Sequence, residues 1–114
     1  MRRFIIYFND GDMKFDMAEL PQVADESHAV VREAKNAGVW IFGGGFFEDK
    51  PVVVTENGEL SVGPLAKSDV RLGGFSVIDC ETEEEAHSWA AKIAKSCRCP
   101  QEVREMIYDP ESTN

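Results

Sequence analysis

The sequence lacks long hydrophobic runs and is poor in basic residues. No apolar stretch approaches the roughly 18 residues that a membrane-spanning helix needs, so we expect no membrane segment. Twelve Lys and Arg stand against 21 Asp and Glu, giving a formal net charge of −9. Proteins that bind nucleic acids or anionic membranes use clustered Lys and Arg. No such run is present, so neither is an expected partner.

Cysteine is also scarce, since the chain has only Cys80, Cys97 and Cys99. An odd number in a chain that is not secreted argues against a disulfide framework. A zinc site needs about four ligands, and only two scattered histidines could join these thiols, so we expect no metal. The helical pattern places Cys97 on a core stripe and leaves Cys99 the more exposed. No motif for a cofactor is present, and we expect none.

The N-terminal Met1-Arg2-Arg3 precedes an apolar run too short for a signal peptide, with no small-residue cleavage site after it. We interpret the run as a buried strand and expect a cytoplasmic protein. Residues 1–114 have the length of one domain, with residues 109–114 as a loose tail. The composition, 43% hydrophobic and 29% charged, is that of a globular protein.

Periodicity and turn residues predict six strands and two helices along the chain. Pro21 suits a helix start and Gly38 a left-handed helix end. Thr82 and Glu85 form a capping box before an apolar stripe that runs to Pro100. Asn57-Gly58 is a strong hairpin signal. The expected strands are 4–8, 39–42, 52–55, 60–62, 72–80 and 102–108, with helices at 21–37 and from 83 to Pro100 and a loop at 65–71.

This order predicts an α+β fold, a ferredoxin-like βαββαβ unit with an extra β-hairpin. Two helices on one face of an antiparallel sheet leave the other face without cover. An apolar sheet face in so small a chain needs a partner, and a second copy is the simplest one. We therefore expect a homodimer.

Residues 62–75, VGPLAKSDVRLGGF, resemble the signature of the YCII-related family in its DGPF-type branch, DGPF-A-E-x-K-E-x-x-GG-F/Y. The resemblance extends over nearly the whole chain. Its other elements are His28 ahead of Ala37-Gly38, the helix with Glu84-Glu85-Ala86 and Trp89-Ala90, then Cys99-Pro100 and Glu102-Val103-Arg104.

The resemblance implies a dimeric α+β barrel in which two ferredoxin-like units pack sheet against sheet. A few relatives are lyase-like enzymes that remove chloride from chlorinated ring-cleavage products with a histidine and an aspartate. Others are linked with sigma factors, which implies a regulatory role. Here Val62 stands in place of the DGPF aspartate, and Leu65, Lys67 and Asp69 also depart from the pattern. Asp69 offers a carboxylate from the same loop but is not taken as equivalent.

His28 is the first candidate catalytic residue. It lies at the edge of the apolar stripe of the first helix, where a side chain can line a cleft, and histidine can move protons near neutral pH. Asp25, one turn earlier, can orient it or simply complement the helix dipole. His28 can equally be a boundary residue bonded for packing alone. His87, beside Glu83 and Glu84, has the setting of a solvated helix face.

Two glycine clusters, which contain Gly44 and Gly74, remove side chains from neighbouring strands and can open a pocket over the sheet. Alternatively, they serve close packing across a dimer interface. The expected substrate-binding walls are Tyr7, Trp40, Phe42 and Phe75, together with Arg104, which can face an anionic ligand or pair with a carboxylate.

Two functions are compatible with these features. The first is a small-molecule enzyme, a lyase or isomerase acting on carboxylated metabolites with His28 as general acid or base. The second is a non-catalytic dimeric regulatory or protein-interaction module, which the missing DGPF aspartate favours.

Overall fold

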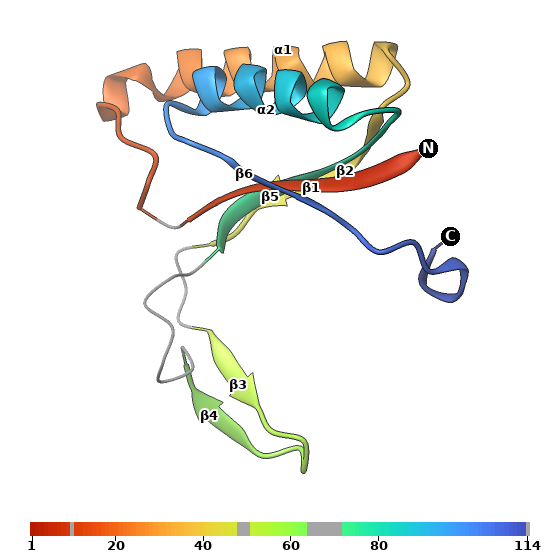
Figure 1. Ribbon diagram of the computed structural model, residues 1–114. Coiled ribbons are helices and arrows are strands. Elements are labelled where there is room, and N and C mark those ends of the chain that lie inside the picture. The colour runs from red at the N-terminus through yellow and green to blue at the C-terminus, as the bar shows by residue number, and fades with distance from the viewer. Residues whose placement is uncertain (10, 48–50, 64–71, 114) are drawn as a thin grey trace.

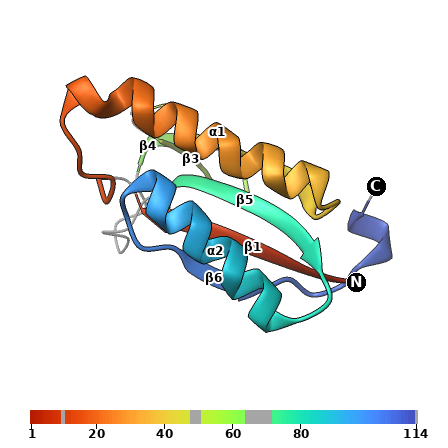
Figure 2. The same ribbon diagram turned by 90° about the horizontal axis from the view of Figure 1, so that it is seen from above.

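The chain builds a four-stranded antiparallel sheet with two helices side by side on one face (Figures 1 and 2). The computed structural model describes residues 1–9, 11–47, 51–63 and 72–113. The sheet has the order β2-β5-β1-β6, and each neighbouring pair is antiparallel. The elements are β1 (Arg2–Asn9), α1 (Leu20–Asn36), β2 (Trp40–Gly45), β3 (Val52–Val54), β4 (Leu60–Val62), β5 (Leu72–Cys80), α2 (Glu83–Cys97) and β6 (Glu102–Glu105).

This topology confirms the predicted fold class. Each β–α–β crossover skips one strand, which is the ferredoxin-like arrangement, and β3 and β4 form the extra hairpin between β2 and β5. Short 3₁₀ turns precede α1 at Met17–Glu19 and follow β6 at Pro110–Ser112. None of the helices in the described parts of the chain is long and apolar enough to cross a membrane.

Local interactions of the backbone set where both helices begin and end. Pro21 lies in the first turn of α1, and Gly38 follows the helix at φ +76°, a conformation that glycine adopts without strain. In α2 the Thr82 hydroxyl accepts a hydrogen bond of 3.1 Å from the backbone N–H of Glu85. The helix ends at Arg98 in a left-handed conformation (φ 62°), ahead of the proline stop that we expected.

The core lies between the helices and the sheet. The large, fully buried side chains come from alternate positions of the two central strands, which point to the same face: Phe4 and Ile6 on β1, and Ile78 and Cys80 on β5. Alanines on the helices, Ala34, Ala86 and Ala90, pack against them. Burial of a large apolar side chain contributes roughly 1.5–3 kcal/mol, so these strands and helices hold the fold together.

Three details differ from the sequence predictions. β2 continues through the glycine triplet to Gly45, because the triplet pairs with β5. β6 ends at Glu105, so the last strand is shorter than expected. Cys99 is buried, which corrects its expected exposure, and burial raises the pKa of its thiol to about 11. The expected loop at 65–71, with Leu65, Lys67 and Asp69, lies outside the described residues.

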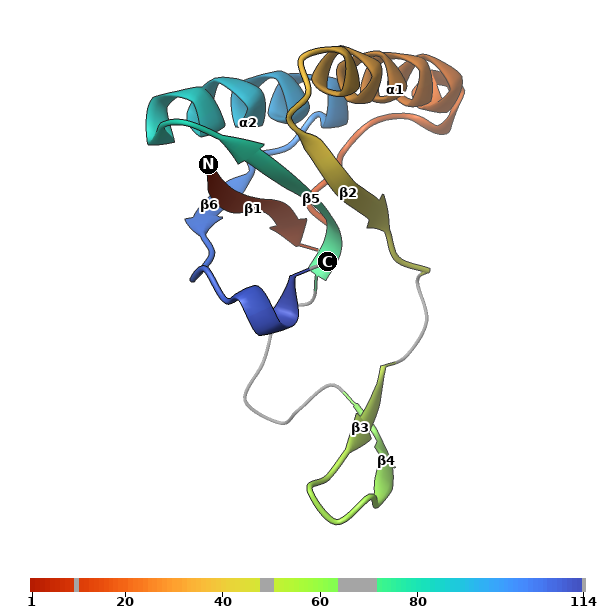
Figure 3. The same cartoon turned by 90° about the vertical axis from the view of Figure 1, so that its right-hand side faces the viewer.

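The opposite sheet face carries no helix (Figure 3). Its central residues are Ile5 and Val77, which face each other across β1 and β5. At one end of this face the Arg3 guanidinium donates two hydrogen bonds to Asp79, at 2.7 and 2.9 Å. This pairing lowers the pKa of the Asp79 carboxyl below its usual value. The face is therefore apolar at its centre, with charged side chains at its margin.

Candidate functional site

A cavity of about 430 Å³ lies between the helices and the β2–β5 side of the sheet. We call it the helix–sheet cleft. Helix α1 supplies one wall, α2 the second, and the glycine-rich strand β2 with part of β5 the floor. Its lining residues are Phe8, Ser27, His28, Val30, Val31, Lys35, Trp40, Gly43, Gly44, Gly45, Phe75, Ser76, Ile93, Ser96, Cys97 and Gln101.

The glycines of β2 leave the cleft hollow. A Cβ at Gly43 would lie 2.7 Å from the Phe75 carbonyl oxygen and 2.8 Å from the Trp40 ring, so no side chain fits there. A Cβ at Gly44 would meet nothing within 4 Å. The triplet therefore lets the Trp40 ring lie against the strand and keeps the floor free of side chains.

The cleft combines a histidine and a lysine with aromatic walls. His28 and Lys35 are seven residues apart on α1, a spacing that puts both on one helix face. Phe8 and Trp40 supply flat apolar surface, while Phe75 borders the cleft with its backbone, whose carbonyl oxygen lies beside Gly43. None of the lining residues is Asp or Glu, although the whole chain carries a net charge of −9. This combination suits a planar ligand with a negative charge.

Smaller polar groups complete the lining. The Ser27 hydroxyl lies 3.8 Å from the Cys97 thiol, so α1 and α2 meet here through side chains that can reorient toward a ligand. The Ser96 hydroxyl is occupied, since it donates to the Ile93 carbonyl at 2.9 Å. Ser76 and Gln101 add a hydroxyl and an amide. The arrangement can orient a polar ring substituent and transfer a proton.

The structure divides the predicted site residues into two groups. His28, Trp40 and Gly44 line the helix–sheet cleft, and Phe75 borders it while its ring lies on the uncovered face beside that of Phe42. Asp25 is exposed on α1 and is not among the lining residues. His28 is itself exposed, more than we expected.

Gly74 serves packing, because a Cβ there would lie 2.9 Å from the Phe8 ring and 3.2 Å from the Gly44 carbonyl oxygen. This packing lies within the protomer, whereas the alternative expected from the sequence was packing across a dimer interface.

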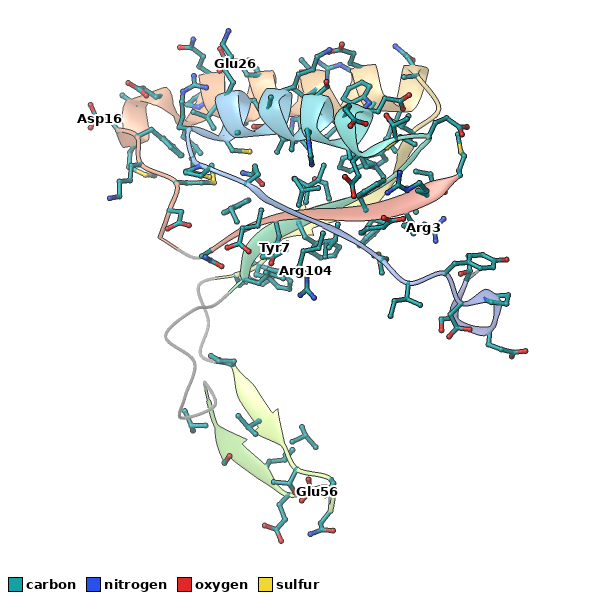
Figure 4. The ribbon with its side chains drawn as sticks, viewed as in Figure 1. Arg3, Tyr7, Asp16, Glu26, Glu56 and Arg104 are labelled. Atoms are coloured by element: carbon teal, nitrogen blue, oxygen red, sulfur yellow. The ribbon has the colours of Figure 1, made fainter. Side chains whose placement is uncertain are left out.

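The remaining predicted residues lie on the uncovered sheet face. Tyr7 pairs in register with Phe75 on β5 and Glu102 on β6 (Figure 4 labels Tyr7 and Arg104). Its hydroxyl donates to a Glu102 carboxylate oxygen at 2.7 Å, and this hydrogen bond raises the Tyr7 pKa, while Arg104 beside it acts in the opposite direction. The Phe42 ring lies 5.9 Å from that of Phe75.

Two further hollows, each of about 570 Å³, are weaker candidates. One lies beside Arg3, Asp79 and the segment after β6, and the other lies along the outer groove between the helices. In both hollows most charged side chains already pair with one another, as Arg3 does with Asp79 and Lys92 with Glu33. Such groups have less free capacity for a ligand than those of the helix–sheet cleft.

Sequence reasoning missed several cleft residues. Ser27, Val31 and Lys35 repeat every four residues on α1, so the helical period contained the signal for Lys35. Gln101 lies in a connection, where no period indicates its direction. Within the described residues, no group of three or more His, Cys, Asp or Glu side chains could hold a metal ion.

Comparisons with known proteins show similarity of fold. No family model matches the chain, and no curated protein matches it. A solved structure, the 5-chloro-2-hydroxyhydroquinone dehydrochlorinase TftG from Burkholderia phenoliruptrix AC1100 in complex with 2,5-dihydroxybenzoquinone, superposes with a TM-score of 0.56. The alignment covers 97% of this chain and 99% of that chain, at 16% sequence identity. The two proteins therefore share an α+β fold.

Proposed function

We propose that the helix–sheet cleft binds a small planar anion, a carboxylated or phenolic ring compound, and that His28 acts on it as a general acid or base. The single observation that supports this most is the lining itself. His28 and Lys35 lie together with the aromatic residues Phe8 and Trp40 in a cavity of about 430 Å³ that has no carboxylate in its wall.

Each group has a chemical role in this proposal. Lys35 neutralises the charge of the ligand, and the aromatic side chains hold its ring. His28 takes up or delivers a proton, as a lyase or isomerase of such compounds requires. Asp25, one turn before His28 on α1, would act from outside the cleft as a positioning residue for the imidazole.

The fold neighbour is consistent with this class of ligand. TftG is a dehydrochlorinase in complex with 2,5-dihydroxybenzoquinone, a planar ring compound with several oxygens. The sequence resemblance to the DGPF-type branch of the YCII-related family supports the same class, and we propose membership of that family. Val62 still replaces the aspartate of the motif, so the proposed chemistry depends on His28 and Lys35 without it.

We also propose that the protein is a cytoplasmic homodimer that uses its uncovered sheet face. Ile5, Phe75 and Val77 offer an apolar surface there, and Phe42 at the edge of the same face is 62% exposed. At the margin Arg3 pairs with Asp79 and the Tyr7 hydroxyl donates to Glu102, while Arg104 lies opposite Ile5. The sequence resemblance to the YCII-related family, which implies a dimeric α+β barrel, supports this arrangement.

The cleft is tested by a thermal-shift titration with 2,5-dihydroxybenzoquinone and a series of hydroxybenzoates. A ligand at 100 times its dissociation constant stabilises a protein by about 2.7 kcal/mol, which is readily measured. We expect at least one of these compounds to raise the Tm of wild type, with the shift lost in His28→Ala and Lys35→Ala. His87, the chain's other histidine, is exposed on α2. His87→Ala is therefore the matched control and should retain the full shift.

The binding proposal would be overturned if none of these compounds raised the Tm of wild type. It would also be overturned if a compound raised the Tm of His28→Ala and of wild type equally. Turnover of a bound compound, followed by its absorbance, then distinguishes an enzyme from a binding module. Binding without turnover would favour the second candidate function, a non-catalytic dimeric regulatory or protein-interaction module, which the exposed apolar surfaces also favour.

A further inference from the structure

The β3–β4 hairpin has one face made entirely of apolar side chains. Val52 pairs with Val62, and Val54 pairs with Leu60. Residues directly opposite each other, and every second residue along a strand, point to the same side. These four side chains therefore form one surface, the hairpin face, and each is between 61% and 75% exposed.

Local interactions build the hairpin without covering this face. Gly58 closes the turn at φ +83°, and its N–H donates to the Thr55 carbonyl oxygen at 2.9 Å. The Thr55 hydroxyl accepts from the Glu59 N–H at 3.0 Å. A two-stranded hairpin on its own is marginally stable in water. Four exposed apolar side chains on such a unit indicate that another surface packs against it.

The hairpin extends from the sheet on the side opposite the helices (Figures 1 and 3). That is also the side of the uncovered sheet face, with Ile5, Phe75 and Val77 at its centre. A body that packs against this sheet face would therefore lie beside the hairpin. One partner can cover both apolar surfaces.

We propose that the hairpin is an intersubunit arm, and that the hairpin face of each protomer packs on the second copy of this chain. The inference rests on the homodimer proposed above. The same chain supplies both apolar surfaces, as a symmetric dimer interface requires. Two copies related by a two-fold axis bury two hairpin faces at once.

The area and the charges fit a second copy. At roughly 60–120 Å² for each buried side chain, the four residues of the hairpin face supply about 240–480 Å². Ile5, Phe75 and Val77, already partly buried in the protomer, add a smaller area toward the ~800 Å² per partner of a stable interface. At the margin Arg3 pairs with Asp79, the Tyr7 hydroxyl donates to Glu102, and Arg104 lies on the same face opposite Ile5. Because Glu102 and Arg104 carry charges of both signs, the same face of a second copy can complement them.

The test compares two adjacent residues on opposite faces of β4. Leu60→Asp places a carboxylate on the hairpin face, and Ser61→Asp places one on the opposite, also exposed side. Wild type and both variants are measured by sedimentation equilibrium across a concentration series. Circular dichroism checks that each variant is folded, which we expect because both sites are exposed within the protomer.

We expect Leu60→Asp to weaken the dimer roughly tenfold or more, and Ser61→Asp to leave its dissociation constant close to that of wild type. A dimer that responds equally to both variants, or to neither, would overturn the arm and leave the homodimer in place. A wild-type monomer at tens of micromolar would overturn both proposals and assign the hairpin face to a different protein.

Discussion

Gly43→Ala is the most informative perturbation of the cleft floor. The new Cβ would lie 2.7 Å from the Phe75 carbonyl oxygen and 2.8 Å from the Trp40 ring, both inside van der Waals contact. The ring can tilt, but the carbonyl belongs to the β5 backbone, so the β2–β5 pairing must shift. Overpacking of this kind typically costs about 1–3 kcal/mol.

Gly44→Ala is the control for this change. Its Cβ would meet nothing within 4 Å, so the replacement adds no clash at the neighbouring position of the same strand. Replacing glycine by alanine at a compatible site stabilises a protein by about 0.4–1 kcal/mol, since it restricts the unfolded chain. The two variants should therefore change stability in opposite directions.

Urea denaturation followed by tryptophan fluorescence measures both effects. We expect the midpoint of Gly43→Ala to fall and that of Gly44→Ala to remain at or above the wild-type value. The displaced Trp40 ring should also change the emission spectrum of the folded Gly43→Ala protein. A Gly43→Ala protein as stable as wild type would refute the close packing of β2 against Trp40 and β5.

Two further predictions concern stability. Thr82→Ala removes the hydroxyl that accepts the Glu85 N–H, so the free energy of unfolding in urea should fall by about 0.5–2 kcal/mol, and an unchanged value would contradict the cap. Asp79→Asn should destabilise the protein by about 1–2 kcal/mol at pH 7, because Arg3 loses its charged partner. Since Arg3 lowers the folded-state pKa of Asp79, this contribution is fully present above the unfolded-state pKa near 4 and is lost as pH falls through the lower folded value. The two proteins should converge in stability toward pH 2, and a gap that stays constant from pH 7 to pH 2 would contradict the ion pair.

Much of the fold was predictable because its signals are local. The Thr82 cap and the apolar stripe after it predicted α2, and Asn57-Gly58 predicted the β3–β4 hairpin. The sequence shows which residues alternate along each strand, but not which residues of neighbouring strands lie opposite each other. The path of β2 through its glycines depends on pairing with β5, and a propensity scale gives glycine no strand signal.

The site was only partly predictable for the same reason. Trp40 and Phe42 are two residues apart, so an ideal strand would point both to one face. The register shifts between them, where Trp40 pairs with Ile78 and Phe42 with Val77. This bulge leaves Trp40 in the helix–sheet cleft and Phe42 on the opposite face. Nothing in the residues around Ile41 indicates it, so the sequence placed both rings in one pocket.

The proposed binding of a planar anionic ligand at His28 is tested most directly by a proton NMR titration of the two histidine imidazoles with salicylate, a small aromatic carboxylate, at constant pH. We expect a saturable shift of the His28 resonances and little change at His87, each assigned by its alanine variant. Unmoved His28 resonances up to millimolar salicylate, or equal shifts at both histidines, would show that the cleft does not bind such a ligand at His28.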